Sequence, residues 1–134
     1  MYSQRKRILY VDDDADTREV IVLLLEMNGY EAKAVATIAE GLEMARGERF
    51  DLYLLDRRFP DGDGIELCRQ IRFFDADTPI VFFSALAYES DRQRGLRAGA
   101  QAYLIKPFDE EAFFATISRL LEDREATDDR QSVN

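Results

Sequence analysis

Five side chains that can bind a cation or a phosphoryl group lie at the ends of four short apolar runs. Asp12 and Asp13 follow "ILYV", Asp56 follows "LYLL", Ser84 follows "IVFF", and Lys106 follows "AYLI". Clustered carboxylates raise the cost of ionising one another, so a cation has to compensate their charge. A few carboxylates completed by water and phosphate oxygens suit Mg²⁺. These residue types therefore indicate a site for a hard cation and a phosphate.

The same residues can also carry out a reaction. An aspartate can act as a nucleophile and form an aspartyl phosphate. A hydroxyl and an ammonium can then bind the phosphoryl oxygens that the cation leaves free. The set predicts phosphoryl transfer onto an aspartate. The chain contains no histidine, so this chemistry has to use carboxylates, hydroxyls and lysine.

Alternating strands and helices must bring these residues together. The apolar runs predict strands at 8–11, 31–35, 52–55, 80–83 and 102–105, and the intervening patterns predict helices at 15–28, 38–46, 64–74, 90–98 and 110–123. Gly29, Gly47 and Gly99 are expected to close helices in the left-handed conformation. Thr37 with Glu40, and Asp109, are expected to cap helix starts. Further acidic residues, Asp14 and Asp16, fit the start of the first helix better than a ligand set.

The wholly apolar strands predict the fold class. Strands without alternation suit a parallel sheet that is covered on both faces. Five strand–helix units then give an α/β fold, a doubly wound (βα)5 sandwich. In such sheets ligands bind outside the carboxyl ends of the strands, where the five candidate residues are expected to converge.

Composition limits the other functions. The chain has 134 residues, enough for one domain, and a net charge of −9, which argues against nucleic-acid binding. Its single cysteine, Cys68, excludes an intrachain disulfide and is expected to be a buried structural thiol. No stretch resembles a signal peptide or a membrane span, so we expect a cytoplasmic protein.

Four segments together resemble the receiver domains of two-component response regulators. They are "ILYVDDD", "DLYLLDRRFPDGDGIEL", "PIVFFSA" and "GAQAYLIKPF", and the resemblance covers about residues 6–122. It implies a flavodoxin-like fold with strand order 2-1-3-4-5. We therefore expect a receiver domain at 1–123. The polar and charged composition of 124–134 indicates a tail or linker that is expected to be frayed or disordered.

The resemblance assigns roles to individual residues. Asp56 corresponds to the phosphoacceptor. Asp13 corresponds to a direct Mg²⁺ ligand and Asp12 to one acting mainly through water, with Mn²⁺ as a substitute ion. Asp56 itself and the backbone carbonyl of Arg58 correspond to further metal ligands, and Ser84 and Lys106 correspond to residues that contact the phosphoryl group. Tyr103 corresponds to the aromatic switch residue that moves after Ser84. The Lys106–Pro107 peptide bond is expected to be cis.

The resemblance also implies partners and regulation. A sensor histidine kinase or a histidine phosphotransfer protein would phosphorylate Asp56, and the face formed by 90–98, 102–105 and 110–123 would change and contact an output domain or protein. Arg58 and Leu86 occupy the positions that tune phosphoryl lifetime, and they predict a long-lived phosphate. One subfamily forms a homodimer through this face with two acidic residues, and Gln101 and Ala102 at those positions argue against such a homodimer here without excluding it.

Two other functions remain as alternatives, and a third reading, a calcium loop, is disfavoured. A degenerate receiver would act as an interaction module without phosphorylation. A hydrolase with an aspartyl phosphate intermediate would place its nucleophile at the first strand in the motif D-x-D-x-T/V. This motif needs Thr or Val at position 16, where the chain has Asp. A calcium loop beginning at Asp12 would need Gly at position 17 and Glu at position 23, where the chain has Thr and Leu.

Overall fold

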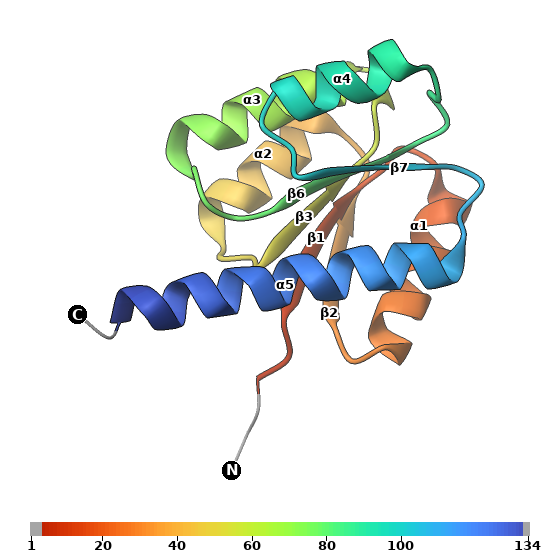
Figure 1. The fold of residues 1–134 in the computed structure, drawn as a ribbon. Helices are drawn as coiled ribbons and strands as arrows, with labels where there is room; N and C mark the ends of the chain where they lie inside the picture. Colours follow the sequence, from red (N-terminus) through yellow and green to blue (C-terminus); the bar gives the residue numbers. More distant parts are fainter. Residues whose placement is uncertain (1–3, 133–134) are drawn as a thin grey trace.

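The computed structural model describes residues 4–132, and five parallel strands form its central sheet (Figure 1). These strands are β1 (Arg7–Val11), β2 (Glu31–Val35), β3 (Leu52–Leu55), β6 (Ile80–Ser84) and β7 (Ala102–Ile105). Their order, β2-β1-β3-β6-β7, is the predicted order 2-1-3-4-5 of a flavodoxin-like sheet. A second, two-stranded antiparallel sheet, β4 (Arg58–Phe59) with β5 (Gly62–Asp63), was not predicted.

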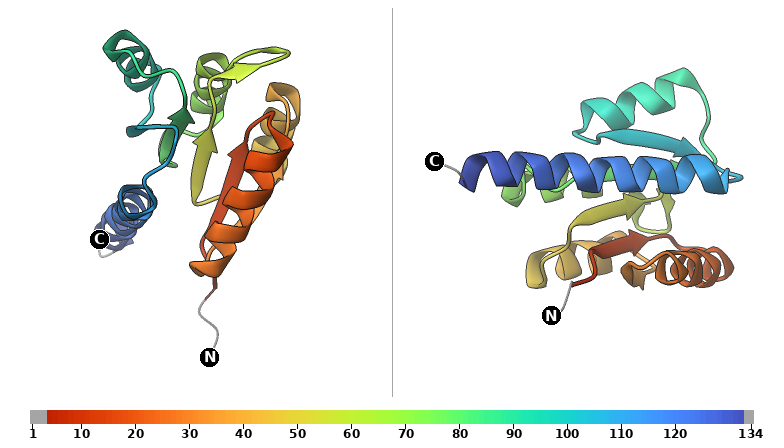
Figure 2. Two further views of the ribbon diagram at one scale, coloured as in Figure 1. Left: turned by 90° about the vertical axis from the view of Figure 1, so that its right-hand side faces the viewer. Right: turned by 60° about the horizontal axis from the view of Figure 1, so that its bottom comes forward.

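Helices cover both faces of the central sheet, as Figures 1 and 2 show. They are α1 (Ala15–Met27), α2 (Ile38–Gly47), α3 (Gly64–Phe74), α4 (Glu89–Arg97) and α5 (Glu110–Ser132). One apolar core joins α2 and α3 to the sheet, and a second joins α1 and α5 to its other face. Among the described residues, no helix has both the length and the apolar character needed to cross a bilayer.

The apolar strands are buried on both faces, as their sequence predicts. In β1, Leu9 and Val11 belong to one core while Ile8 and Tyr10 belong to the other. The side chains of β3 and β6 are buried in the same way. Cys68 is also buried and free, and burial raises the pKa of its thiol to about 11. It is therefore a structural thiol, as expected.

Most of the predicted helix ends are confirmed. The side chain of Asp14 accepts a hydrogen bond from Thr17 N–H at 3.0 Å, so it caps α1. Thr37 and Asp109 cap α2 and α5. Gly29 and Gly99 have φ values of +90° and +119°, the left-handed conformation expected after a helix.

Two expectations about helix ends were wrong. Gly47 lies inside α2 and does not have a positive φ, because α2 runs into an extended C-cap at Glu48 instead of a left-handed turn. α5 continues to Ser132 instead of ending at Asp123, so the helix passes without a break through the segment expected to be a frayed tail. Arg124 anchors this extension by donating to the Asp51 carbonyl at 3.2 Å.

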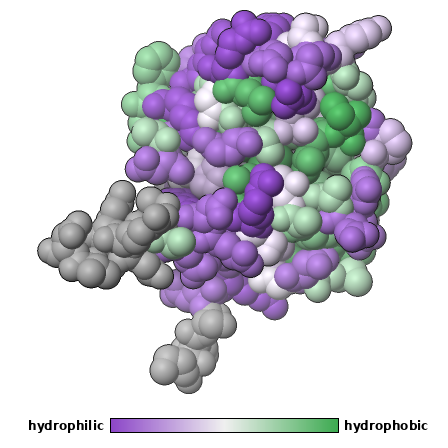
Figure 3. Space-filling view, in the orientation of Figure 1, coloured by the Kyte–Doolittle hydropathy of each residue, from purple (hydrophilic) through white to green (hydrophobic). Residues whose placement is uncertain are grey.

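The face formed by α4, β7 and α5 is mainly polar. In Figure 3 hydrophilic residues cover α4 at the top of the view, and apolar residues show between α4 and α5. Ile105, at the end of β7, is 39% exposed.

Candidate functional site

The ends of β1, β3, β6 and β7 meet at one open pocket of about 660 Å³, as the sequence predicted. Its lining combines carboxylates, a hydroxyl and an ammonium with apolar side chains, from Asp13, Asp56, Arg58, Phe59, Pro60, Ser84, Ala85, Leu86 and Lys106. Arg58 is exposed and Ser84 is buried. The pocket is therefore a concave, charged site at the carboxyl edge of a parallel sheet.

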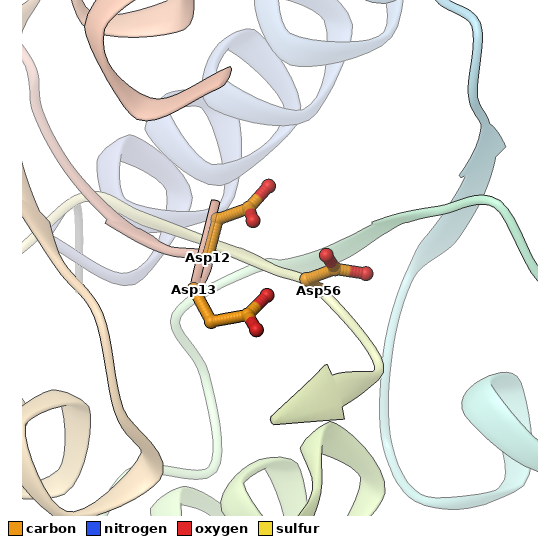
Figure 4. Close-up of side chains that lie close together, drawn as sticks. All are labelled: Asp12, Asp13 and Asp56. Carbon is orange, nitrogen blue, oxygen red and sulfur yellow. The ribbon is translucent and has the colours of Figure 1, made fainter. Parts of the chain in front are cut away.

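Three carboxylates form the acidic part of this site (Figure 4). Asp12, Asp13 and Asp56 can each offer one oxygen, and these oxygens lie within 4.8 Å of one another. Asp12 is fully buried, Asp56 is 8% exposed and Asp13 is exposed. Hard oxygen ligands at this spacing suit a divalent cation that keeps part of its water shell.

Asp12 is held by three donors, so its oxygens are largely used within the protein. Its Oδ1 accepts from Asp14 N–H at 2.9 Å, and its Oδ2 accepts from Lys106 Nζ at 2.8 Å. The hydroxyl of Tyr10 also donates to Oδ2. Burial, and then the Asp12 carboxylate, raise the pKa of Tyr10 well above its usual range, so Tyr10 remains a donor. The sequence shows Tyr10 only as a member of the apolar run 8–11, so this contact was not predicted.

Asp56 sits between a backbone donor and a lysine. Its Oδ1 accepts from Arg57 N–H at 2.7 Å and its Oδ2 accepts from Lys106 Nζ at 3.0 Å. Burial is the largest influence on the pKa of Asp56 and raises it, although the Arg57 N–H and Lys106 oppose this. For Lys106, burial lowers the pKa, but the Asp12 and Asp56 carboxylates outweigh it and raise the pKa. Lys106 is therefore a fixed positive charge beside both carboxylates.

Ser84 and Tyr103 are linked through the backbone of Leu86. Ser84 Oγ accepts from Leu86 N–H at 3.1 Å, and Tyr103 donates its hydroxyl proton to the Leu86 carbonyl at 2.8 Å. The Tyr103 ring packs on Phe82 with centroids 5.8 Å apart. A short chain of contacts thus joins the pocket to β7 and to the face between α4 and α5.

Of the remaining predicted residues, Arg58 and Leu86 line the pocket, while Pro107, Asp14 and Asp16 are not among its lining residues. The Lys106–Pro107 peptide is cis, as expected. Leu86 lines the pocket, and the β4–β5 hairpin carries Arg58 at its start. Asp14 and Asp16 lie at the start of α1, so the helix occupies the positions where a calcium loop would continue.

Sequence reasoning also missed Arg57, whose side chain is only 1% exposed although it carries a charge. Its guanidinium pairs with Asp63 at 2.9 Å. The available signal was its position directly after Asp56, together with an aspartate six residues further along. No periodicity separates a buried arginine of this kind from an exposed loop arginine.

Comparisons with known proteins agree with this geometry. The family model described as "Response regulator receiver domain" matches residues 8–118. Response regulator MprA of Mycobacterium avium (strain 104) is 41% identical over 127 residues, and the match covers 95% of this chain and 56% of the relative. Response regulator MprA of Mycobacterium leprae (strain TN) is 42% identical over the same shares of the two chains. The chain thus spans about half the length of the curated relatives that it matches.

Solved structures are similar over nearly the whole chain. A CheY-like receiver domain protein from Methanospirillum hungatei JF-1 has a TM-score of 0.88 and 32% identity, covering 92% of this chain and 99% of that one. The receiver domain of sensor histidine kinase PA1611 from Pseudomonas aeruginosa PAO1 has a TM-score of 0.82 and 31% identity, covering 89% and 99%. The chain therefore belongs to the response regulator receiver domains of two-component systems.

Proposed function

We propose that Asp56 accepts a phosphoryl group in a Mg²⁺-dependent reaction, and that phosphorylation changes the face formed by α4, β7 and α5. The observation that carries this proposal is the contact of 3.0 Å between Lys106 Nζ and Asp56 Oδ2 at the pocket into which Ser84 also opens. A nucleophilic carboxylate beside a fixed cation and a hydroxyl is the arrangement that phosphoryl transfer to aspartate requires.

Asp13, Asp56 and the Arg58 carbonyl are the proposed direct ligands of the metal ion, and Asp12 would act mainly through water. The three donors that already engage the Asp12 carboxylate support this indirect role. When bound, Mg²⁺ would neutralise charge on the phosphoryl oxygens, and Mn²⁺ would substitute. The PA1611 receiver domain, a similar structure, has a magnesium ion coordinated in its active-site cleft.

The proposed reaction uses the free electron pair of an Asp56 oxygen. This oxygen attacks phosphorus, the bond from phosphorus to the histidine nitrogen of the donor breaks, and the nitrogen keeps that electron pair. Lys106 and Ser84 then bind oxygens of the transferred group. The donor would be a sensor histidine kinase or a histidine phosphotransfer protein, since this chain has no histidine.

The proposed switch runs from Ser84 to Tyr103. Movement of Ser84 toward the phosphoryl group would alter its contact with Leu86 N–H, and the Leu86 carbonyl is the acceptor for Tyr103. Repacking of Tyr103 would change β7 and its neighbours, which an output domain or protein would recognise. A symmetric dimer through this face receives no support from Gln101, because its side chain already accepts from Ile80 N–H at 2.7 Å.

Arg58 and Leu86 are proposed to make the aspartyl phosphate long-lived. Both line the pocket, where the arginine can pair with phosphoryl oxygens and the leucine can exclude water. Loss of label should accelerate when either residue is replaced by alanine. Rapid hydrolysis that slows on replacement would contradict this proposal.

Uptake of radiolabel from acetyl phosphate tests the proposed function. The wild-type chain should take up close to one phosphoryl group in the presence of Mg²⁺, and Asp56→Asn or removal of the metal should abolish uptake. Asp77→Asn, which changes an exposed aspartate remote from the pocket lining, is the matched control. Absence of uptake by the wild type would instead favour an interaction module that is not phosphorylated, and continuous turnover of a phosphate ester would favour a hydrolase.

A further inference from the structure

Arg57 places a buried positive charge between four elements of the fold. Its Nε and Nη2 donate to the two carboxylate oxygens of Asp63 at 2.9 and 3.1 Å. Its Nη1 lies 3.3 Å from both the carbonyl oxygen of Asp91 and the hydroxyl oxygen of Tyr103. One side chain thus joins the end of β3 to the β4–β5 hairpin, to α4 and to β7.

A charge with 1% exposure is stable only when its donors are satisfied. The bidentate pairing with Asp63 provides this and also fixes the plane of the guanidinium. Burial is the largest influence on the pKa of Asp63 and raises it, but the hydrogen bonds from Arg57 and Ile65 N–H, with the charge of Arg57, together outweigh burial and lower that pKa. Asp63 also caps α3 through Ile65 N–H at 2.9 Å, so the carboxylate itself is anchored.

The backbone of Arg57 is held as firmly as its side chain. Its carbonyl accepts from Gly64 N–H at 2.7 Å, and its own N–H donates to Asp56 Oδ1 at 2.7 Å. The residue that orients the acceptor carboxylate is therefore the residue whose guanidinium contacts Tyr103. A displacement of Arg57 would therefore alter the contacts of both the Asp56 carboxylate and the Tyr103 hydroxyl.

We propose that Arg57 is a positioning residue that holds Tyr103 and the start of α4 against the acceptor end of β3, as a second connection that does not pass through Ser84. This rests on the proposed function, in which Tyr103 is the switch. The first connection passes from Ser84 through Leu86 to the Tyr103 hydroxyl, and the second reaches the same hydroxyl from Arg57. The position of Tyr103 therefore depends on the Arg57–Asp63 pair as well as on the phosphoryl site.

NMR of the chain labelled in its tyrosine rings tests this directly. The chain has six tyrosines, and the signal of Tyr103 is identified by its loss in Tyr103→Phe. In Arg57→Met, that signal should move from its position beside Phe82 toward the shift of a free tyrosine. Amide exchange in α4 should also become about tenfold faster, because hydrogen bonds from a charged donor are lost. Arg57→Lys, which keeps the charge but not the planar fork, should give an intermediate shift.

Two further variants make the outcome decisive. Arg69→Met is the matched control, because Arg69 lies on α3 and is 59% exposed. The Tyr103 signal of this variant should match that of the wild type. If Arg57→Met does not fold, Asp63→Asn decides instead, since asparagine can still cap α3 while the ion pair is lost. An unchanged Tyr103 signal in the folded variants would overturn the proposal. A shifted signal would support it specifically, because general destabilisation alone does not move this signal under native conditions.

The same samples separate this proposal from the proposed function. Acetyl phosphate labelling is measured on the wild type in parallel. If the wild type takes up no label, the proposed function fails while the NMR comparison still decides the role of Arg57. If it is labelled and Tyr103 is unaffected in the Arg57 variants, only the positioning role fails.

Discussion

The ammonium of Lys106 lies 3.0 Å from the Asp56 carboxylate, although fifty residues separate them in the sequence. The same nitrogen lies 2.8 Å from Asp12, so one lysine compensates two buried carboxylates. This relationship depends on the parallel sheet, which brings the carboxyl ends of β1, β3 and β7 to a common edge.

Lys106→Met is expected to destabilise the chain and to slow phosphoryl uptake. Removing the cation leaves Asp12 and Asp56 without their charged donor, which should lower the free energy of unfolding by about 2 kcal/mol. Urea unfolding measures this change. Lys33→Met is the control, because Lys33 is 43% exposed and its pairing with Glu48 should contribute less than about 1 kcal/mol. Equal effects of the two variants would contradict the role given to Lys106.

Gly64→Ala should be strongly destabilising. A Cβ at this position would lie 1.9 Å from the Asp56 carbonyl oxygen, so the backbone that carries the acceptor would have to shift. We expect a loss of about 3 kcal/mol and slower phosphorylation. Gly47→Ala is the matched helical substitution, with open space around its Cβ, and should stabilise the chain by about 0.5–1 kcal/mol. Thermal unfolding of both variants checks the pair.

Mg²⁺ should raise the thermal stability of the wild-type chain. At a concentration tenfold above its Kd, a ligand that binds only the folded state contributes about 1.4 kcal/mol. Asp13→Asn should remove this response, because it removes an oxygen ligand from the acidic cluster. Asp16→Asn, an exposed aspartate in the first turn of α1, should keep it. A full Mg²⁺ response in Asp13→Asn would place the ion elsewhere.

Asp56→Asn should make the chain more stable at neutral pH. Because burial raises the pKa of Asp56 in the folded state, the unfolded chain ionises this group first as the pH rises above 3.8. The contribution of Asp56 to the free energy of unfolding is therefore fully present at low pH. It is lost as the pH rises through the pKa of Asp56 in the folded state. Unfolding measured from pH 3 to 8 should show the variant's advantage growing with pH. An advantage that is constant across this range would contradict the raised pKa.

The central sheet and most of the site could be predicted from the sequence because they depend on strong local signals. Fully apolar strands imply a parallel sheet, and in such a sheet the residues that follow each strand must converge. This placed Asp12, Asp13, Asp56, Ser84 and Lys106 at one pocket edge without any knowledge of side-chain contacts.

Features that depend on tertiary contacts could not be predicted. Arg57 resembles an exposed loop arginine until Asp63, Asp91 and Tyr103 are placed around it. The extension of α5 is polar. Arg124 anchors it to the Asp51 carbonyl just before β3, and no local sequence pattern predicts this contact. The hairpin of β4 and β5 has only two residues in each strand, too few for any periodicity.

Mapping the modified residue tests the central claim most directly. The chain is incubated with acetyl phosphate and Mg²⁺, the acyl phosphate is trapped by borohydride reduction, and the peptides are sequenced by mass spectrometry. We predict that the trapped modification lies at Asp56 and is absent when Mg²⁺ is removed. Modification at Asp12, Asp13 or Ser84, or an unmodified peptide containing Asp56 after full incubation, would contradict the claim.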